Sequence, residues 1–425
     1  MKKQMKWLLA ALALAALATP AFAVTADMTG TLAVRALSVN NFDGTDDKQD
    51  HGRFADQRFR LFTSVAANEN VKAVLGLEVD NVLGRTNSDL AKKDLGGMGT
   101  DETAKLEIKH LYLDFKIPAL NANVKAGSQP FNFGRGMIIN DDAAGLLVSI
   151  PCPVIPENVL QLSWIKTSEG APTKGVEANN KNDGDFYGAK YSLKVADIAI
   201  APYAGYYTAG VGALTNTSQT DAGFFGVDVD GKTGPFGYAL TAIYNNWNGA
   251  GEKDGDSFSY YGKGTMDMGA TTLSLEAARL GDVDNGGNAM SLAQNDATGP
   301  VVNVSEILTG GMYTSNSSIY ANKGGAAALY TTNWLYAKIG AVQKLSDSMK
   351  VSAYVAHIQQ ASDVKGAPGT TVTDAITYGQ EVDAYFDYTI VPGLGFNVMG
   401  AYLFADNDFG DDDAYKLGTS LNYKF

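Results

Sequence analysis

The sequence has very few of the residues that build disulfides, thiolate metal sites and histidine chemistry. It contains one cysteine, Cys152, and three histidines among 425 residues. A single cysteine excludes a disulfide within the chain and a zinc site made of several thiolates. The histidines His51, His110 and His357 lack the spacing of metal ligands, and no G-x-S-x-G motif is present. The sequence therefore predicts no enzyme, no cofactor and no bound metal.

Positive charge and long apolar runs are also scarce. Lys and Arg number 33 against 46 Asp and Glu, and the formal net charge is -13. Proteins that bind nucleic acid need a basic stripe, so this balance predicts no nucleic-acid partner. After residue 23, no apolar run approaches the roughly 18 residues of a membrane-spanning helix. We therefore expect no transmembrane helix in the mature chain.

Residues 1–23 have the pattern of a secretory signal peptide. Three lysines precede the apolar run WLLAALALAALA, and Ala21-Phe22-Ala23 is a small-x-small cleavage site. We expect this segment to be removed and residues 24–425 to form a single domain. Removal would leave about 402 residues and would lower the formal charge to roughly -16.

Most of the remaining chain alternates between apolar and polar residues, as strands do. In VKAVLGLEVD, residues 71–80, Leu75, Leu77 and Val79 lie opposite Glu78 and Asp80. The preceding QRFRLFTSVA alternates in the same way, and a short polar turn joins the two segments. Together they predict a β-hairpin.

Seven such hairpins, with the first and last strands, make sixteen strands. Two further segments alternate between the second and third of these hairpins: AAGLLVSI at 143–150 and VLQLSWIK at 159–166. The PCPVIPEN sequence between them is too rich in proline for a strand interior. We predict eighteen strands, with sixteen as the alternative.

The last twelve residues, AYKLGTSLNYKF, alternate and end on an aromatic side chain. Tyr423 and Phe425 lie on the apolar face. Short and long connections also alternate along the chain, as in outer-membrane barrels. These features resemble the Gram-negative outer-membrane β-barrel proteins, whose last strand typically ends in Phe. A soluble secreted β-protein is the alternative.

That resemblance implies an all-β fold, a transmembrane antiparallel up-and-down β-barrel in the outer membrane of a Gram-negative bacterium. Its partners would be outer-membrane lipid, lipopolysaccharide and the outer-membrane assembly machinery. In that family the last strand, here with Tyr423 and Phe425, is the assembly signal. The general porins, which this chain resembles, also suggest a homotrimer.

A barrel of sixteen to eighteen strands leaves a water-filled channel. By strand parity the side chains expected in the lumen are Arg35, Arg58, Arg60, Lys72, Glu78 and Asp114. Residues 130–144, with Arg135, Asp141 and Asp142, resemble the constriction loop of general porins by position and charge. By that resemblance Asp141 and Asp142 would face Arg35, Arg58 and Arg60.

We therefore expect passive diffusion of small hydrophilic solutes and ions. A mild cation preference is suggested by the inward carboxylates Asp228, Asp230, Glu276, Glu381, Asp383 and Asp387. The lumenal lysines Lys125, Lys190 and Lys350 leave an anion or phosphate pore open. A structural or adhesive barrel that binds a partner through loop 281–331 is a further alternative. The acidic loops 281–288 and 406–413 are read as solvated, with calcium binding as the alternative.

Overall fold

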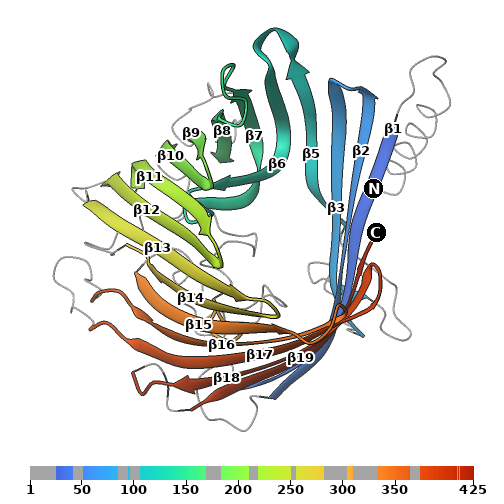
Figure 1. Cartoon of the computed structure of the whole chain (residues 1–425), viewed down its shortest axis with the longest axis vertical. Coiled ribbons are helices and arrows are strands. Elements are labelled where there is room, and N and C mark those ends of the chain that lie inside the picture. Colours follow the sequence, from blue (N-terminus) through green and yellow to red (C-terminus); the bar gives the residue numbers. More distant parts are fainter. Residues whose placement is uncertain are drawn as a thin grey trace, which may run out of the picture.

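The fold is an antiparallel β-barrel closed between its first and last strands (Figure 1). This computed structural model describes residues 25–41, 51–84, 94–95, 106–168, 183–209, 219–249, 255–281, 304–309, 333–363, 374–408, 410 and 412–425. The segment expected to be a signal peptide, 1–23, lies outside these residues.

Nineteen strands are assigned, and all but one form the barrel wall. The exception is the two-residue β4, which pairs parallel with the end of β3. The wall thus has eighteen strands, which confirms the predicted count and excludes sixteen. The strands are β1 (Thr25–Asn40), β2 (His51–Asn68), β3 (Val71–Leu83), β4 (Asp94–Leu95), β5 (Leu106–Ile117), β6 (Ala122–Phe133), β7 (Ile139–Pro151), β8 (Val159–Ser168), β9 (Gly184–Val195), β10 (Ile198–Ala209), β11 (Gln219–Thr233), β12 (Phe236–Gly249), β13 (Gly255–Met268), β14 (Thr271–Arg279), β15 (Trp334–Lys344), β16 (Met349–Gln360), β17 (Thr377–Val391), β18 (Leu394–Ala405) and β19 (Ala414–Lys424).

The two strands that decide the count are β7 and β8. They contain the predicted segments 143–150 and 159–166 and pair antiparallel from Ala144 opposite Lys166 to Pro151 opposite Val159. The proline-rich stretch between them is a turn, closed by a 2.7 Å bond from the Cys152 N–H to the Asn158 carbonyl. One single-turn 3-10 helix, η1 (Pro118–Leu120), connects β5 to β6.

Alternation along each strand separates an apolar outer face from the lumen. On β19, Leu417, Leu421 and Tyr423 are exposed, whereas the intervening Lys416 and Ser420 are buried. A closed sheet pairs its backbone groups without leaving an open edge, which suits a barrel with a lipid-facing exterior. No helix among the described residues is long and apolar enough to cross a membrane.

Part of the barrel interior is filled with apolar side chains. Inward residues of β9 to β18, such as Phe186, Phe224 and Tyr336, pack with two segments that leave the wall. One is the distal half of the β6–β7 hairpin, which includes Phe133 and Ile138, and the other is residues 304–309. The core of this protein therefore lies inside the barrel and narrows the lumen.

Candidate channel constriction

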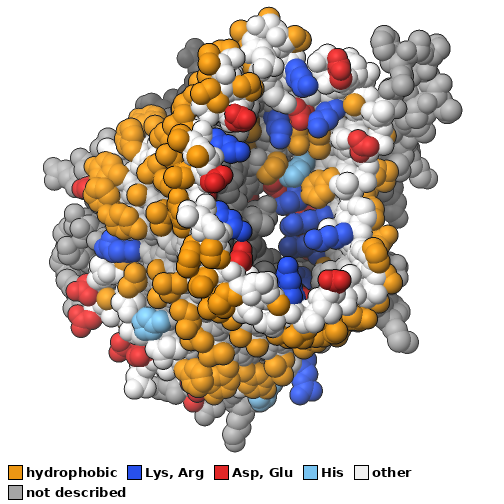
Figure 2. Space-filling view, in the orientation of Figure 1, with side chains coloured by type: hydrophobic (Ala, Val, Ile, Leu, Met, Phe, Trp, Pro, Cys, Tyr) orange, Lys and Arg blue, Asp and Glu red, His pale blue; other side chains and the backbone are white. Residues whose placement is uncertain are grey.

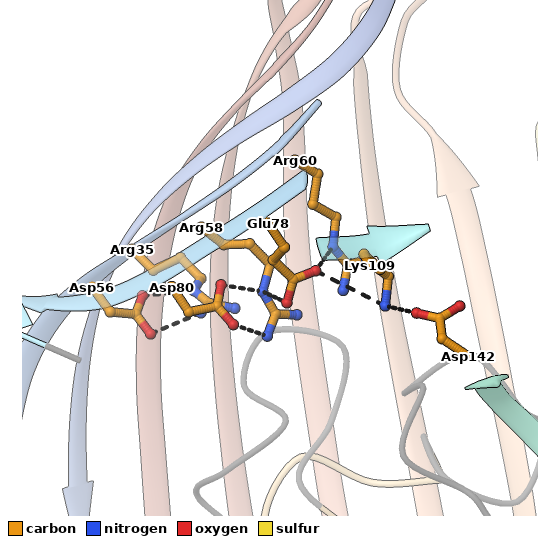
Figure 3. Close-up of polar contacts among 8 residues, drawn as sticks. All are labelled: Arg35, Asp56, Arg58, Arg60, Glu78, Asp80, Lys109 and Asp142. Atoms are coloured by element: carbon orange, nitrogen blue, oxygen red, sulfur yellow. Dashed lines mark hydrogen bonds and ion pairs between the residues drawn. The ribbon is translucent and has the colours of Figure 1, made fainter. Parts of the chain in front are cut away.

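Four basic side chains and their carboxylate partners form a ladder across strands β1, β2, β3 and β5 (Figure 3). The basic side chains are Arg35, Arg58, Arg60 and Lys109. Arg35 donates from Nε and Nη2 to the Asp56 carboxylate, both at 2.7 Å. Arg58 binds Asp80 in the same bidentate way, at 2.7 and 2.8 Å. Each arginine lies directly opposite its carboxylate in the strand register, so the pairing follows from the alternation itself.

The third and fourth steps of the ladder share a carboxylate. Arg60 pairs with Glu78, its register partner on β3. The Lys109 ammonium lies 4.0 Å from Glu78 and 2.5 Å from Asp142. The predicted lumenal positions Arg35, Arg58, Arg60 and Glu78 are therefore brought together on one side of the barrel.

Lys109 reaches the ladder because of a β-bulge. Gly76 pairs with His110 and Leu77 with Ile108, so Lys109 is an extra residue in β5. Leu106 and Ile108 are exposed before the bulge and Leu111 and Leu113 after it, which shows that the parity of β5 reverses there. Lys109 and His110 consequently both bond to Asp142 in the lumen.

The predicted constriction segment, 130–144, does lie inside the barrel, but it is a strand hairpin and not a loop. β6 pairs with β5 only to Ser128, and β7 pairs with β8 only from Ala144. In the described sheet, residues 129–143 pair solely within the hairpin. The turn is confined to 134–138, where Gly134, Arg135 and Gly136 all have positive φ. Because glycine adopts this region freely, the turn can be this tight.

Asp142 connects this hairpin to the ladder, with His110 Nε2 at 2.9 Å and Lys109 at 2.5 Å. The expected arrangement, in which Asp141 and Asp142 pair with arginines of the wall, differs from this one. The arginines take Asp56, Asp80 and Glu78 from their own sheet, and Asp142 joins the ladder through Lys109. Asp141 accepts a 2.8 Å bond from the Asp142 N–H.

The tip of the hairpin is held against β11 and β12. Arg135 donates to both Asp230 oxygens at 2.9 Å and from Nε to Thr241 Oγ1 at 2.7 Å. Its guanidinium also lies 5.8 Å from the centre of the Tyr261 ring. The left-handed backbone at Arg135 costs free energy, and these side-chain contacts offset that cost. The predicted pore residue Arg135 therefore pins the inserted hairpin.

An aromatic cluster also holds the hairpin against the wall of the barrel. Phe133 contacts Phe186 and Tyr203 edge to face, with ring centres 5.0 and 5.2 Å apart. A Cβ on Gly188 or Gly205 would lie 2.8 or 3.2 Å from the Phe133 ring. The two glycines therefore leave the space on β9 and β10 that the ring occupies.

The remaining predicted pair, Lys72 and Asp114, lies apart from the ladder. Lys72 is 3.4 Å from Asp114, and its side chain is 46% exposed. The two residues are register partners near the short-turn ends of β3 and β5. Asn123 donates a further 3.0 Å bond to Asp114. This pair lines the lumen at one mouth.

Most of the predicted acidic wall residues are neutralised by bases. Asp228 is 3.5 Å from Lys190, Glu276 is 3.2 Å from Lys263, and Asp387 is 3.4 Å from Lys350. Lys125 lies over the Tyr112 ring at 5.8 Å. Among the described residues, no group of three or more His, Cys, Asp or Glu could hold a metal ion. The wall therefore carries paired charges of both signs.

Residues 304–309 are a second inserted segment, which the sequence analysis assigned to a long outer loop. They bond to β15, β17 and β19 through Lys338, Glu381, Tyr385 and Lys416. The sequence carries one sign of this insertion: within the polar stretch 281–331, the short run VSEIL contains three apolar residues. It is too short to predict insertion.

Figure 2 shows an opening near the centre of the barrel, with Lys and Arg side chains gathered along one side of it. That side is the one formed by β1 to β5 in Figure 1. The tip of the inserted hairpin bonds to β11 and β12, and residues 304–309 bond to β15, β17 and β19. The open path thus runs beside the charged ladder.

No protein-family model matches the sequence, and no curated protein matches it. Solved structures do. Pseudomonas aeruginosa OccK9 (OpdG) is 14% identical with a TM-score of 0.58, covering 94% of this chain and 98% of its own. The outer membrane protein OpdK from the same organism is 14% identical with a TM-score of 0.57, covering 94% of this chain and 99% of its own. Pseudomonas aeruginosa OccK2 (OpdF), solved in complex with glucuronate, is 12% identical with a TM-score of 0.54, covering 94% of this chain and 96% of its own.

The chain has an outer-membrane porin fold. At these identities the likeness establishes the fold alone, and the apolar exterior agrees with an outer-membrane barrel. OpdK has also been solved with vanillate. The neighbours are channel proteins and not enzymes.

Proposed function

We propose that this chain forms a water-filled channel in the outer membrane through which small hydrophilic solutes diffuse. The observation that carries the proposal is the charged ladder beside an opening in a closed eighteen-stranded barrel. The wall side chains at this opening are polar and charged, so a solute that crosses can exchange bonds to water for bonds to the wall.

The paired charges favour weak selectivity between simple ions. The lumenal carboxylates that suggested a cation preference mostly have a lysine or arginine within 4 Å, such as Asp228 with Lys190. A pore whose fixed charges are balanced locally exerts a small net field on a passing ion. We therefore infer a reversal potential close to zero in a KCl gradient.

A second candidate, a preference for solutes that carry a carboxylate, is favoured by the ladder itself. Arg60 and Lys109 share Glu78, and Lys109 and His110 share Asp142, so three N–H-bearing side chains face two carboxylates there. Guanidinium groups bind carboxylates in a planar, bidentate geometry. Vanillate and glucuronate, seen with OpdK and OccK2, are both carboxylates.

Conductance of the purified protein in a planar lipid bilayer tests the channel. We expect discrete current steps whose size rises in proportion to the salt concentration. A protein that inserts and gives no steps would overturn the proposal and would favour a structural or adhesive barrel. The homotrimer, expected from the resemblance to general porins, is tested by the mass of the detergent-solubilised particle.

Solute preference is tested with proteoliposomes by comparing glucuronate with glucose, which are similar in size and differ in the carboxylate. We expect glucuronate to enter faster per channel. Replacing Arg58 and Arg60 by Gln should remove that difference, whereas Lys72→Gln, at the mouth, should keep it. Equal entry rates in the unmodified protein would refute the carboxylate preference and leave the channel proposal standing.

A further inference from the structure

Residues 304–309 are buried throughout, although they belong to the connection between β14 and β15. Each of the six side chains is at most 2% exposed. Their partners are side chains of β15, β17 and β19, which enclose the lumen. The segment therefore lies inside the barrel, packed against the wall and shielded from water.

Two of its backbone groups are bound by one wall carboxylate. Glu381 accepts hydrogen bonds from the N–H of Ile307 at 2.6 Å and from the N–H of Leu308 at 3.0 Å. Lys338 donates to the Val304 carbonyl at 3.2 Å. Ser305 and Thr309 bond to each other across the segment, at 2.9 and 2.7 Å. The wall thus holds the segment as a compact turn.

Glu306 is held by a buried ion pair. Lys416 Nζ donates to Glu306 Oε2 and to the Glu306 carbonyl, both at 2.9 Å. Tyr385 donates from its hydroxyl to Glu306 Oε1 at 2.7 Å. The side chains of Lys416 and Glu306 are both 0% exposed. Both charges are removed from water, so each depends on the other for its solvation.

The apolar contacts of the segment are less selective. Ile307 and Leu308 pack into the large apolar cluster inside the barrel, and apolar contacts of this kind are not directional. The Lys416–Glu306 pair, in contrast, requires Glu306 to lie within hydrogen-bond distance of Lys416. Buried polar pairs can specify one arrangement at a cost in stability.

We propose that the Lys416–Glu306 pair is a latch that holds residues 304–309 in the lumen and thereby sets the size of the open path. This rests on the proposed channel function. Removing one partner leaves the other charge buried and unpaired, which favours release of the segment. Removing both charges leaves only the less selective apolar contacts and the two Glu381 bonds, so release of the segment is favoured there too.

Four proteins test the latch by single-channel conductance: the unmodified chain, Lys416→Met, Glu306→Gln and the double variant. We expect each single variant to conduct about 1.5-fold more or higher, because the opening widens. The double variant, which also lacks the pair, should conduct more than the unmodified chain as well. Lys350→Met removes an exposed lumenal lysine on β16 that pairs with Asp387, and it should change conductance little. A double variant that conducts like the unmodified chain would overturn the latch, because the segment would then stay in place without the pair.

Thiol labelling reports the position of the segment directly. In a Cys152→Ser background, Leu308→Cys should resist a water-soluble maleimide, and adding Lys416→Met should expose it. Labelling that is equally slow with and without Lys416 would refute the latch. If Lys416→Met does not assemble, Glu306→Gln replaces it in the labelling test, because that substitution leaves the strands of the wall unchanged. Labelling requires no conductance, so failure of the channel proposal remains distinguishable from failure of the latch.

Discussion

Phe425 and Gly30 close the barrel with two reciprocal backbone hydrogen bonds. The Gly30 N–H donates to the Phe425 carbonyl at 2.9 Å, and the Phe425 N–H donates to the Gly30 carbonyl at 3.2 Å. The Phe425 ring lies over Gly30, where a Cβ would come within 2.4 Å of it. The last aromatic side chain therefore has a place on the first strand that only glycine provides.

Gly30→Val should weaken this closure. The added side chain would meet the Phe425 ring and the Arg60 carbonyl, the latter 2.7 Å from the new Cβ. Overpacking of this kind costs about 1–3 kcal/mol. We expect the change in gel mobility that accompanies unfolding on heating to occur at a lower temperature than in the unmodified protein. Gly264→Val on β13 is the matched control, since nothing lies within 4 Å of its Cβ; an equal effect of both substitutions would contradict the role of Gly30.

Deletion of Phe425 should reduce the amount of assembled barrel and leave the conductance of assembled channels unchanged. The residue supplies both closing hydrogen bonds with Gly30 and a stacked contact with Tyr423, with ring centres 5.5 Å apart. It lies far from the ladder in the strand register, because Arg35 is opposite Ser420. Membrane-fraction yield and single-channel current are the two measurements. A normal yield would argue against Phe425 as an assembly signal.

Alternation alone predicted the strand count and the lumenal positions of Arg35, Arg58 and Arg60, because a period of two leaves little freedom in a closed sheet. Lys109 was missed because a bulge reverses the parity of β5. That reversal is visible in the sequence, where apolar positions 106 and 108 are followed by 111 and 113. The insertion of 304–309 depends on contacts with Lys416, more than a hundred residues away, which no local pattern contains.

Cys152 offers a test of the orientation of the barrel. It lies in the short turn between β7 and β8, which we expect to face the periplasm. Hydrogen bonds to its thiol sulfur from the backbone at Ile155 and Val154 lower the pKa of Cys152. The thiolate is the reactive form, so alkylation should begin at a lower pH than for an ordinary thiol. In intact cells a bulky polyethylene-glycol maleimide should not react until the outer membrane is permeabilised. Labelling of intact cells would place this turn outside.

Lys109→Met should shift the selectivity of the channel towards cations. The change removes one positive charge from the ladder. Glu78 remains paired with Arg60, and Asp142 keeps its hydrogen bond with His110. Asp142 then loses its Lys109 partner, which lies 2.5 Å away, so the ladder gains net negative charge. The reversal potential in a KCl gradient is the measurement.

The matched control for Lys109→Met is Lys72→Met, which removes the same charge from a half-exposed position at the mouth. Water screens that position well, so the reversal potential should move less. Equal shifts for both variants would mean that the ladder is not the narrowest charged part of the path. The bulge that re-aims Lys109 would then have no electrostatic role in permeation.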